Sequence, residues 1–217
     1  MKRLLPAMLI LLAGCAQQVT SVSVPGIEQS NSVKVTDLRP ESEKQPEIFS
    51  YVVSSDAYAI YRIADTSVVP PATRILQHRA FEKFGAGSAP LEIKIHHLVI
   101  YRNLQSEFRT AAMLGGIGGA IGGAIAYTVV KEAQGFANSA PDIKVFESLA
   151  ATEFRRAYYT EQENSDRASV NVIYIETEIR GRRVFTRAVS PTVGKNREDL
   201  LPAALESAIK FHLAQYP

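Results

Sequence analysis

The stretch LEIKIHHLVIY, residues 91–101, has the clearest strand pattern in the chain. Apolar residues alternate with charged or polar ones from Leu91 to His96, which is the period of two expected of a strand with one buried face. The continuation from His97 to Ile100 is more uniformly apolar, so we expect both faces of the strand to be covered there.

A second strand and its partner lie near the end of the chain. Val170 to Ile179 is rich in β-branched residues, and a turn at Gly181 would pair it with Val184 to Val189 as a hairpin. Shorter runs with strand character cover residues 33–38, 48–53 and 57–63, and the charged residues 41–47 are expected to form a loop.

Three segments have the apolar spacing of helices. One opens at Pro70-Pro71 and ends at Gly85, a second starts at Pro141, and a third is expected to be capped by Asn196. The buried stripe of the third is Leu201, Ala204, Leu205, Ala208 and Ile209. This order of elements predicts an α+β domain, with an antiparallel sheet and helices packed on one face, over residues 33–104 and 141–217.

The first fifteen residues have the composition of a secretory signal. Lys2 and Arg3 precede an apolar run from Leu4 to Leu12 that is too short to span a bilayer. Leu12-Ala13-Gly14-Cys15 resembles the lipobox of bacterial lipoproteins, in which the cysteine is acylated and becomes the new N-terminus. The resemblance implies that residues 1–14 are removed and that Cys15 carries lipid; the alternative is an ordinary cleaved signal that contains a cysteine.

The mature N-terminus has further features of an envelope lipoprotein. Cys15 is the only cysteine, so lipidation would leave no unpaired thiol. Residues 15–32 are polar and lack a helical period, and we expect them to form a tether. Ala16 stands where inner-membrane lipoproteins typically carry aspartate, which implies the outer membrane with the domain facing the periplasm. The net charge of +2 includes no basic stripe, so no nucleic-acid partner is expected.

Residues 111–130 contain no charge, and as a helix they would be about 30 Å long, close to the apolar thickness of a bilayer. Small residues recur within them at the four-residue spacing that lets two helices approach closely. The glycines of this expected helix-packing face are Gly115, Gly118, Gly119, Gly122 and Gly123. The sequence thus predicts a glycine-zipper apolar helical insertion over residues 105–140.

Three fates of this insertion remain open. It can enter the membrane, pack against copies of itself or another envelope protein, or form a buried hairpin in an oligomer. A single full crossing would place residues 91–101 and 170–189 on opposite sides of the bilayer, where they could not share a sheet. A turn at Gly118-Gly119 or Gly122-Gly123 would avoid that separation.

From the lipobox through residue 213, the order of elements is similar to that of the TraT surface-exclusion lipoproteins and of the YajG-type lipoproteins. The first group has a glycine-rich apolar insertion at the same place, and the second lacks it. TraT-like chains carry two apolar stretches in the insertion, whereas this chain has one. The resemblance implies a membrane-anchored protein of the cell envelope that forms homo-oligomers or binds an envelope partner.

No arrangement of reactive side chains predicts catalysis, a metal site or a cofactor. His96 and His97 are expected to point to opposite faces of their strand, and the other histidines, His78 and His212, to lie at the surface. Glu176 and Glu178 have arginines close by, which indicates a solvated charge cluster. Asp37 and Arg39 share a strand face and are expected to form an ion pair at the strand end.

Two classes of function are compatible with these features. The first is a non-enzymatic envelope interaction protein, which includes an accessory subunit of a transport or secretion machine. The second is a carrier of lipid or a small molecule, which requires an apolar cavity between the sheet and its helices.

Overall fold

The fold is that of a computed structural model. It describes residues 19–53, 56–85, 91–103, 128–131, 135–142, 144–145 and 170–217, together with residues 148, 153 and 157. The expected signal segment 1–14, Cys15 and the glycines between 115 and 123 lie outside the described residues. So does most of the uncharged segment 111–130.

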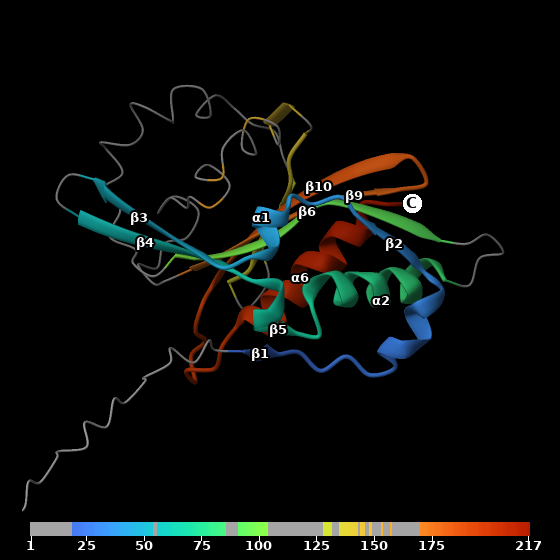
Figure 1. The fold of residues 1–217 in the computed structure, drawn as a ribbon, viewed down its shortest axis with the longest axis horizontal. Coiled ribbons are helices and arrows are strands. Elements are labelled where there is room, and N and C mark those ends of the chain that lie inside the picture. Colours follow the sequence, from blue (N-terminus) through green and yellow to red (C-terminus); the bar gives the residue numbers. More distant parts are fainter. Residues whose placement is uncertain are drawn as a thin grey trace, which may run out of the picture.

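Eight of the described strands form one sheet, in the order β3-β4-β6-β9-β10-β8-β7, with β2 paired to β6 beside β4 (Figure 1). The strands of this sheet are β2 (Lys34–Asp37), β3 (Glu47–Val53), β4 (Asp56–Ile63), β6 (Glu92–Asn103), β7 (Thr128–Lys131), β8 (Ala137–Ala140), β9 (Val170–Ile179) and β10 (Arg182–Pro191). The expected strands at 33–38, 48–53, 57–63, 91–101 and 170–189 are confirmed within a few residues.

The α+β class is confirmed, but the sheet is mixed rather than purely antiparallel. β2 runs parallel to β6, with Val35 opposite Ile93. A separate small sheet pairs β1 (Thr20–Ser21) in parallel with β5 (Val68–Val69). The pattern of alternation within a strand reports which face is buried, but it carries no information on the direction of the neighbouring strand.

The β9–β10 hairpin turns at Arg180 and Gly181. Both have positive φ, 53° and 76°, and Ile179 pairs directly with Arg182 across the turn. This is the two-residue hairpin turn whose twist matches that of the strands. A Cβ added at Gly181 would meet nothing within 4 Å, so the left-handed backbone, rather than a lack of space, favours glycine there.

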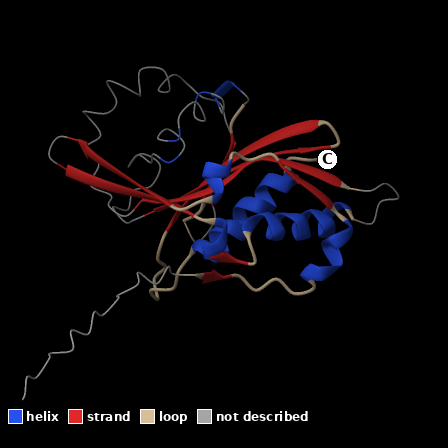
Figure 2. Ribbon diagram, in the orientation of Figure 1, coloured by secondary structure: helices blue, strands red, loops and turns tan. Residues whose placement is uncertain are grey.

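Helices α2 (Ala72–Phe84) and α6 (Leu201–Ala214) cover one face of the main sheet (Figure 2). They contact each other, and α6 also contacts β9 and β10. The core between the two layers is built from residues with 0% exposure, which are Ile75, Leu76, Ile93, Ile95, Ile175, Leu205, Ala208 and Ile209. The expectation that both helices bury their apolar stripes on one face is therefore confirmed.

The last helix begins later than expected. Residue 200 precedes its first turn, and the backbone N–H of Leu201 donates to the Asp199 carboxylate at 3.0 Å. Asn196 is not its cap but lies in a loop over residues 192–199. Val193 and Asp199 form a β-bridge across that loop, which holds it closed before the helix starts.

Residues 19–32 are not a free tether, contrary to expectation. β1 pairs with β5, Val22 is 9% exposed in the core, and a 3-10 helix, η1 (Ile27–Ser32), follows. Arg74 on α2 donates to the carbonyl of Ile27 at 2.6 Å and to Ser30 at 3.0 Å. These hydrogen bonds attach a polar segment to the domain. The segment has no apolar periodicity, so its sequence gives no sign that it is attached.

Two further expectations are corrected by short elements. Residues 41–44, expected to be loop, form a one-turn helix, α1 (Glu41–Lys44), and a 3-10 turn, η2 (Asp65–Ser67), follows β4. β7 and β8 form an antiparallel pair, and β8 also pairs with β10. The C-terminal part of the helical insertion expected over 105–140 is therefore strand rather than helix.

In the segment where a helix was expected from Pro141, residues 144, 145, 148, 153 and 157 are described and helical.

Candidate functional site

The densest group of charged contacts among the described residues surrounds α1, which lies against β6. Arg39, just before this helix, is 5% exposed, and Glu43 within it is 1% exposed. Burying an arginine and a glutamate requires partners, because an unpaired charge out of water is very unfavourable. We call the group the α1 cluster, and its members are Asp37, Arg39, Glu43, Asp65, His97, Glu176 and Arg183.

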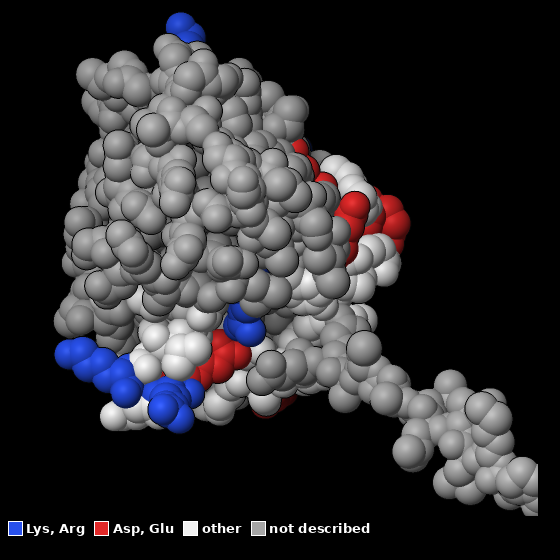
Figure 3. Space-filling model, turned by 90° about the vertical axis from the view of Figure 1, so that its left-hand side faces the viewer, with Lys and Arg blue, Asp and Glu red and all other residues white. Residues whose placement is uncertain are grey.

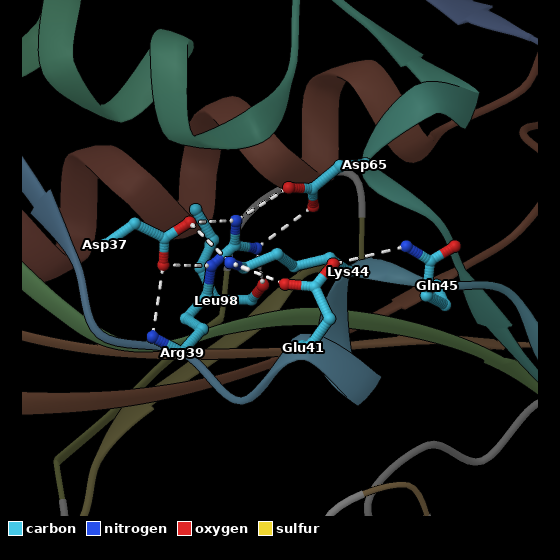
Figure 4. Close-up of polar contacts among 7 residues, drawn as sticks. All are labelled: Asp37, Arg39, Glu41, Lys44, Gln45, Asp65 and Leu98. Atoms are coloured by element: carbon cyan, nitrogen blue, oxygen red, sulfur yellow. Dashed lines mark hydrogen bonds and ion pairs between the residues drawn. The ribbon is translucent and has the colours of Figure 1, made fainter.

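The Arg39 guanidinium lies between two carboxylates (Figure 4). Nε and Nη2 donate to Asp37 at 2.9 and 2.8 Å, while Nη1 and Nη2 donate to Asp65 at 3.0 and 2.6 Å. Nη1 also donates to the carbonyl of Leu98 at 2.9 Å. All five N–H donors of the side chain are therefore used, which is the full capacity of a guanidinium.

This arrangement joins three parts of the chain that are distant in sequence. Asp37 ends β2, Asp65 opens η2 after β4, and Leu98 lies in β6. Burial raises the pKa of Asp37, but hydrogen bonds from the Arg39 side chain and backbone outweigh it and leave that pKa below its usual value. The ion pair expected for Asp37 and Arg39 is confirmed, and Asp65 is the partner that the sequence did not indicate.

Glu43, within α1, contacts His97, whose Nδ1 lies 2.6 Å from a Glu43 carboxylate oxygen. The other imidazole nitrogen, Nε2, is 3.7 Å from Glu176, and Arg183 forms an ion pair with Glu176. Glu176 is 2% exposed, so the expectation that it belongs to a solvated charge cluster is wrong.

A β-bulge in β6 explains why His97 reaches Glu176. The register between β6 and β9 shifts between Ile95 and His97, so His96 is the additional residue. His96 lies 3.7 Å from Glu178, which shares a strand face with Glu176. Both histidines therefore contact carboxylates of the same face of β9, and the expectation that they point to opposite faces is wrong because a bulge interrupts the alternation.

A second buried arginine holds the other end of α1. Arg62 on β4 is 2% exposed and donates to the carbonyl of Gln45 at 2.8 Å and to Glu47 at 2.6 Å. It also pairs with Glu153, which accepts a hydrogen bond from Tyr101 at 2.9 Å. Arg39 and Arg62 thus fix α1 from both sides, and the cluster anchors this helix to the sheet.

The chemistry available to the α1 cluster is ion pairing and hydrogen bonding: among the contacts of His97, Glu43 lies within hydrogen-bond distance, while Glu176 lies 3.7 Å away. Among the described residues there is no group of three or more histidine, cysteine, aspartate or glutamate side chains with the geometry to hold a metal ion. In the same part of the chain, no helix combines the length and apolar character needed to cross a bilayer.

Two histidines expected at the surface are buried. His78 on α2 is 2% exposed, and His212 on α6 is 0% exposed. The His212 ring lies 2.7 Å from the Thr177 hydroxyl and 2.9 Å from that of Thr186. Neutral imidazole can satisfy both contacts, and burial lowers the pKa of His212 to about 3.

We expect His212 to make folding sensitive to acid. The folded state keeps it neutral down to about pH 3, whereas the unfolded chain protonates it near 6.5. Its contribution to the free energy of unfolding is therefore complete above pH 6.5 and decreases as the pH falls toward 3, by roughly 1 kcal/mol per pH unit. Urea melts between pH 7 and 4 should show this slope for the wild type and lose it for His212→Gln. An equal slope in both proteins would contradict the assignment.

The sequence-predicted sites at Cys15, Gly115, Gly118, Gly119, Gly122 and Gly123 lie outside the described residues. The sequence predicted the Asp37–Arg39 pair and placed arginines near Glu176, but it did not bring these groups together into one cluster, because five segments of the chain contribute to it. Comparison with models of protein families, with curated proteins and with solved structures finds no match to the chain.

Proposed function

We propose that the chain is a lipoprotein of the cell envelope, anchored in the outer membrane through acylated Cys15, and that it acts by binding other proteins or copies of itself rather than by catalysis. The observation that carries this proposal is Leu12-Ala13-Gly14-Cys15, placed directly after an apolar run with basic residues before it. The resemblance to TraT and YajG-type lipoproteins, which rests on the order of elements, agrees with it.

The α1 cluster supports a scaffolding role. Its three buried charged side chains, Arg39, Glu43 and Glu176, contact charged or titratable partners within the domain. Such a cluster gives a rigid, specifically oriented surface element, since a buried charge network tolerates few alternative packings. This favours a domain that presents a fixed surface to partners.

The alternative, a carrier with a cavity between sheet and helices, has less support. The residues that face each other between the helices and the sheet, including Ile75 on α2, Ile93 on β6 and Leu205 on α6, have 0% exposure. A side chain that bordered an internal space large enough for a water molecule would retain some accessible area. The interlayer core of the described residues is therefore filled by its own side chains.

The anchor is tested by Cys15→Ser. The variant should lack lipid and be released from membranes by carbonate, because the thiol that accepts the lipid is absent. The wild type should stay in the membrane fraction, and its mature N-terminal peptide should have the mass of an acylated cysteine. A wild-type N-terminus with the mass of unmodified cysteine would overturn the proposal, whereas fractionation with the inner membrane would overturn only the assignment to the outer membrane.

Self-association is tested at Gly119 and Ile121. Gly119→Leu should weaken assemblies, because a leucine on a small-residue face holds helix backbones apart. Ile121→Leu, on the opposite side of the expected helix, keeps the apolar surface and should assemble like the wild type. Crosslinking in detergent extracts compares the variants, and unchanged assembly of Gly119→Leu would leave the glycine face without a role in association.

A further inference from the structure

Exposed valines gather where the described chain begins. Val19, Val69 and Val193 are 55%, 51% and 52% exposed, and they are three of the four large apolar residues that the described residues leave exposed. Val19 precedes β1, and Val69 lies in β5, which pairs with β1. Valines at this exposure carry no core function, so their position relative to the proposed anchor is informative.

Val193 belongs to the same region through the loop over residues 192–199. The hydroxyl of Thr20 in β1 donates to Asp199 at 3.4 Å, and Asp199 forms the β-bridge with Val193. Figure 1 shows this loop beside β1 at the lower left of the molecule. We call the group formed by Val19, Val69, Val193, Lys195 and Arg197 the β1 face.

The tip of this loop carries two exposed cations beside two carboxylates. Lys195 and Arg197 are exposed, and Figure 3 shows Lys and Arg side chains at the lower edge of the view with Asp and Glu side chains beside them. The two acidic residues of the loop are also exposed, but each is hydrogen-bonded: Glu198 accepts from the backbone of Asn196 at 2.9 Å, and Asp199 accepts from Arg102 at 3.2 Å. The two outermost cations therefore remain available to an anionic partner.

The length of chain before Val19 limits how far this region can lie from a membrane. Four peptide steps connect Cys15 to Val19, and an extended chain covers at most about 14 Å in that number. If lipid on Cys15 is embedded in a bilayer, the start of β1 must lie within that distance of the lipid headgroups. The residues beside it in the fold are exposed valines and free cations, the combination suited to the interface of a bilayer with anionic lipids.

We infer that the β1 face is a membrane-docking surface that rests on the phospholipid leaflet in which Cys15 is anchored. The inference depends on the proposed lipid anchor and adds an orientation to it. β10 ends at Pro191, next to the β1 face, and begins at Arg182. The β9–β10 turn thus lies about 30 Å away along the strand, given its usual rise per residue. In the docked domain, this turn would point away from the membrane.

The absence of tryptophan from the chain allows a site-specific test. Val193→Trp would place a single tryptophan in the β1 face, and Arg182→Trp would place one at the distant turn. Both positions are at the surface, and thermal melts would establish that each variant folds like the wild type. The full-length, processed proteins are reconstituted into vesicles of phosphatidylethanolamine and phosphatidylglycerol, with and without bromine on the acyl chains.

We expect the Val193→Trp emission to shift to the blue and to lose intensity with brominated lipid, while the Arg182→Trp emission stays unchanged. Adding Lys195→Glu and Arg197→Glu to the first variant should reduce the quenching. Mass spectrometry of the N-terminus separates the two proposals. An acylated Cys15 without quenching at position 193, or with equal quenching at both positions, overturns the docking surface alone. An unmodified Cys15 overturns the anchor and, with it, the inference.

Discussion

Replacing Ile93 with aspartate is expected to unfold the domain at room temperature. Ile93 is 0% exposed near the start of β6, opposite Val35 on one side and Ile179 on the other. An aspartate there must either bury a charge without a partner or take up a proton, and each route costs several kcal/mol. That cost is comparable with the total stability of an ordinary domain, about 5–15 kcal/mol.

Circular dichroism during thermal and urea melts would measure the effect. The matched control is Lys94→Ala, at the next residue of the same strand. Lys94 pairs with Glu178 at 2.8 Å, but its side chain is 42% exposed. Loss of this pair should therefore change stability by about 1 kcal/mol or less. A melting curve of Ile93→Asp that matched the wild type would show that this face of β6 is not in the core.

The second large effect is expected for Arg39→Met, which keeps much of the side-chain volume and removes the five donors. Asp37, Asp65 and the Leu98 carbonyl would lose their common partner. We expect a loss of about 3 kcal/mol, the lower end for breaking a buried ion pair. It is the lower end because the Asp37 and Asp65 side chains are 32% and 28% exposed and can be hydrated.

The loss of stability in Arg39→Met should depend on pH. Burial raises the pKa of Asp37, but the hydrogen bonds and charge of Arg39 outweigh it and keep that pKa below its ordinary value of about 3.8, so Asp37 stabilises the folded state above that pH. This contribution decreases as the pH falls through the lowered pKa of the folded state. The stability difference between wild type and Arg39→Met should therefore be largest near neutral pH and should shrink below about pH 4.

Lys44→Met is the control for this experiment. Lys44 lies 3.8 Å from Asp37 and 3.1 Å from Glu41, and its side chain is 27% exposed, so it touches the same carboxylate without being buried. We expect a loss of about 1 kcal/mol or less. If Arg39→Met were no more destabilising than Lys44→Met, the guanidinium would not be the centre of the cluster.

The elements that follow hydrophobic periodicity could be predicted from the sequence. β6 begins with an alternating buried face, β9 and β10 are rich in β-branched residues and buried along most of their length, and α2 and α6 bury apolar stripes. In each, the pattern over about ten residues reports burial directly. Gly181 could also be recognised as a turn residue, because few residues other than glycine adopt a positive φ.

The α1 cluster could not be predicted in the same way. Arg39 and Asp65 are 26 residues apart in sequence, and His97 and Glu43 are 54 apart, so no local pattern connects them. The bulge that brings His96 and His97 to one face leaves no distinctive residue, such as a glycine, in β6. His78 and His212 carry the polar character of surface residues, yet each is buried in the packed structure.

The amino-acid sequence by itself determined the candidate anchor at Cys15, the α+β class and the apolar faces of the long elements, because each is a local property of composition, spacing or periodicity. Only the tertiary structure decided the parallel pairing of β2, the attachment of residues 19–32 to the domain and the partners of each buried charge. The reason is physical. Electrostatic and hydrogen-bond partners are chosen by distance in space, and the folded backbone sets that distance.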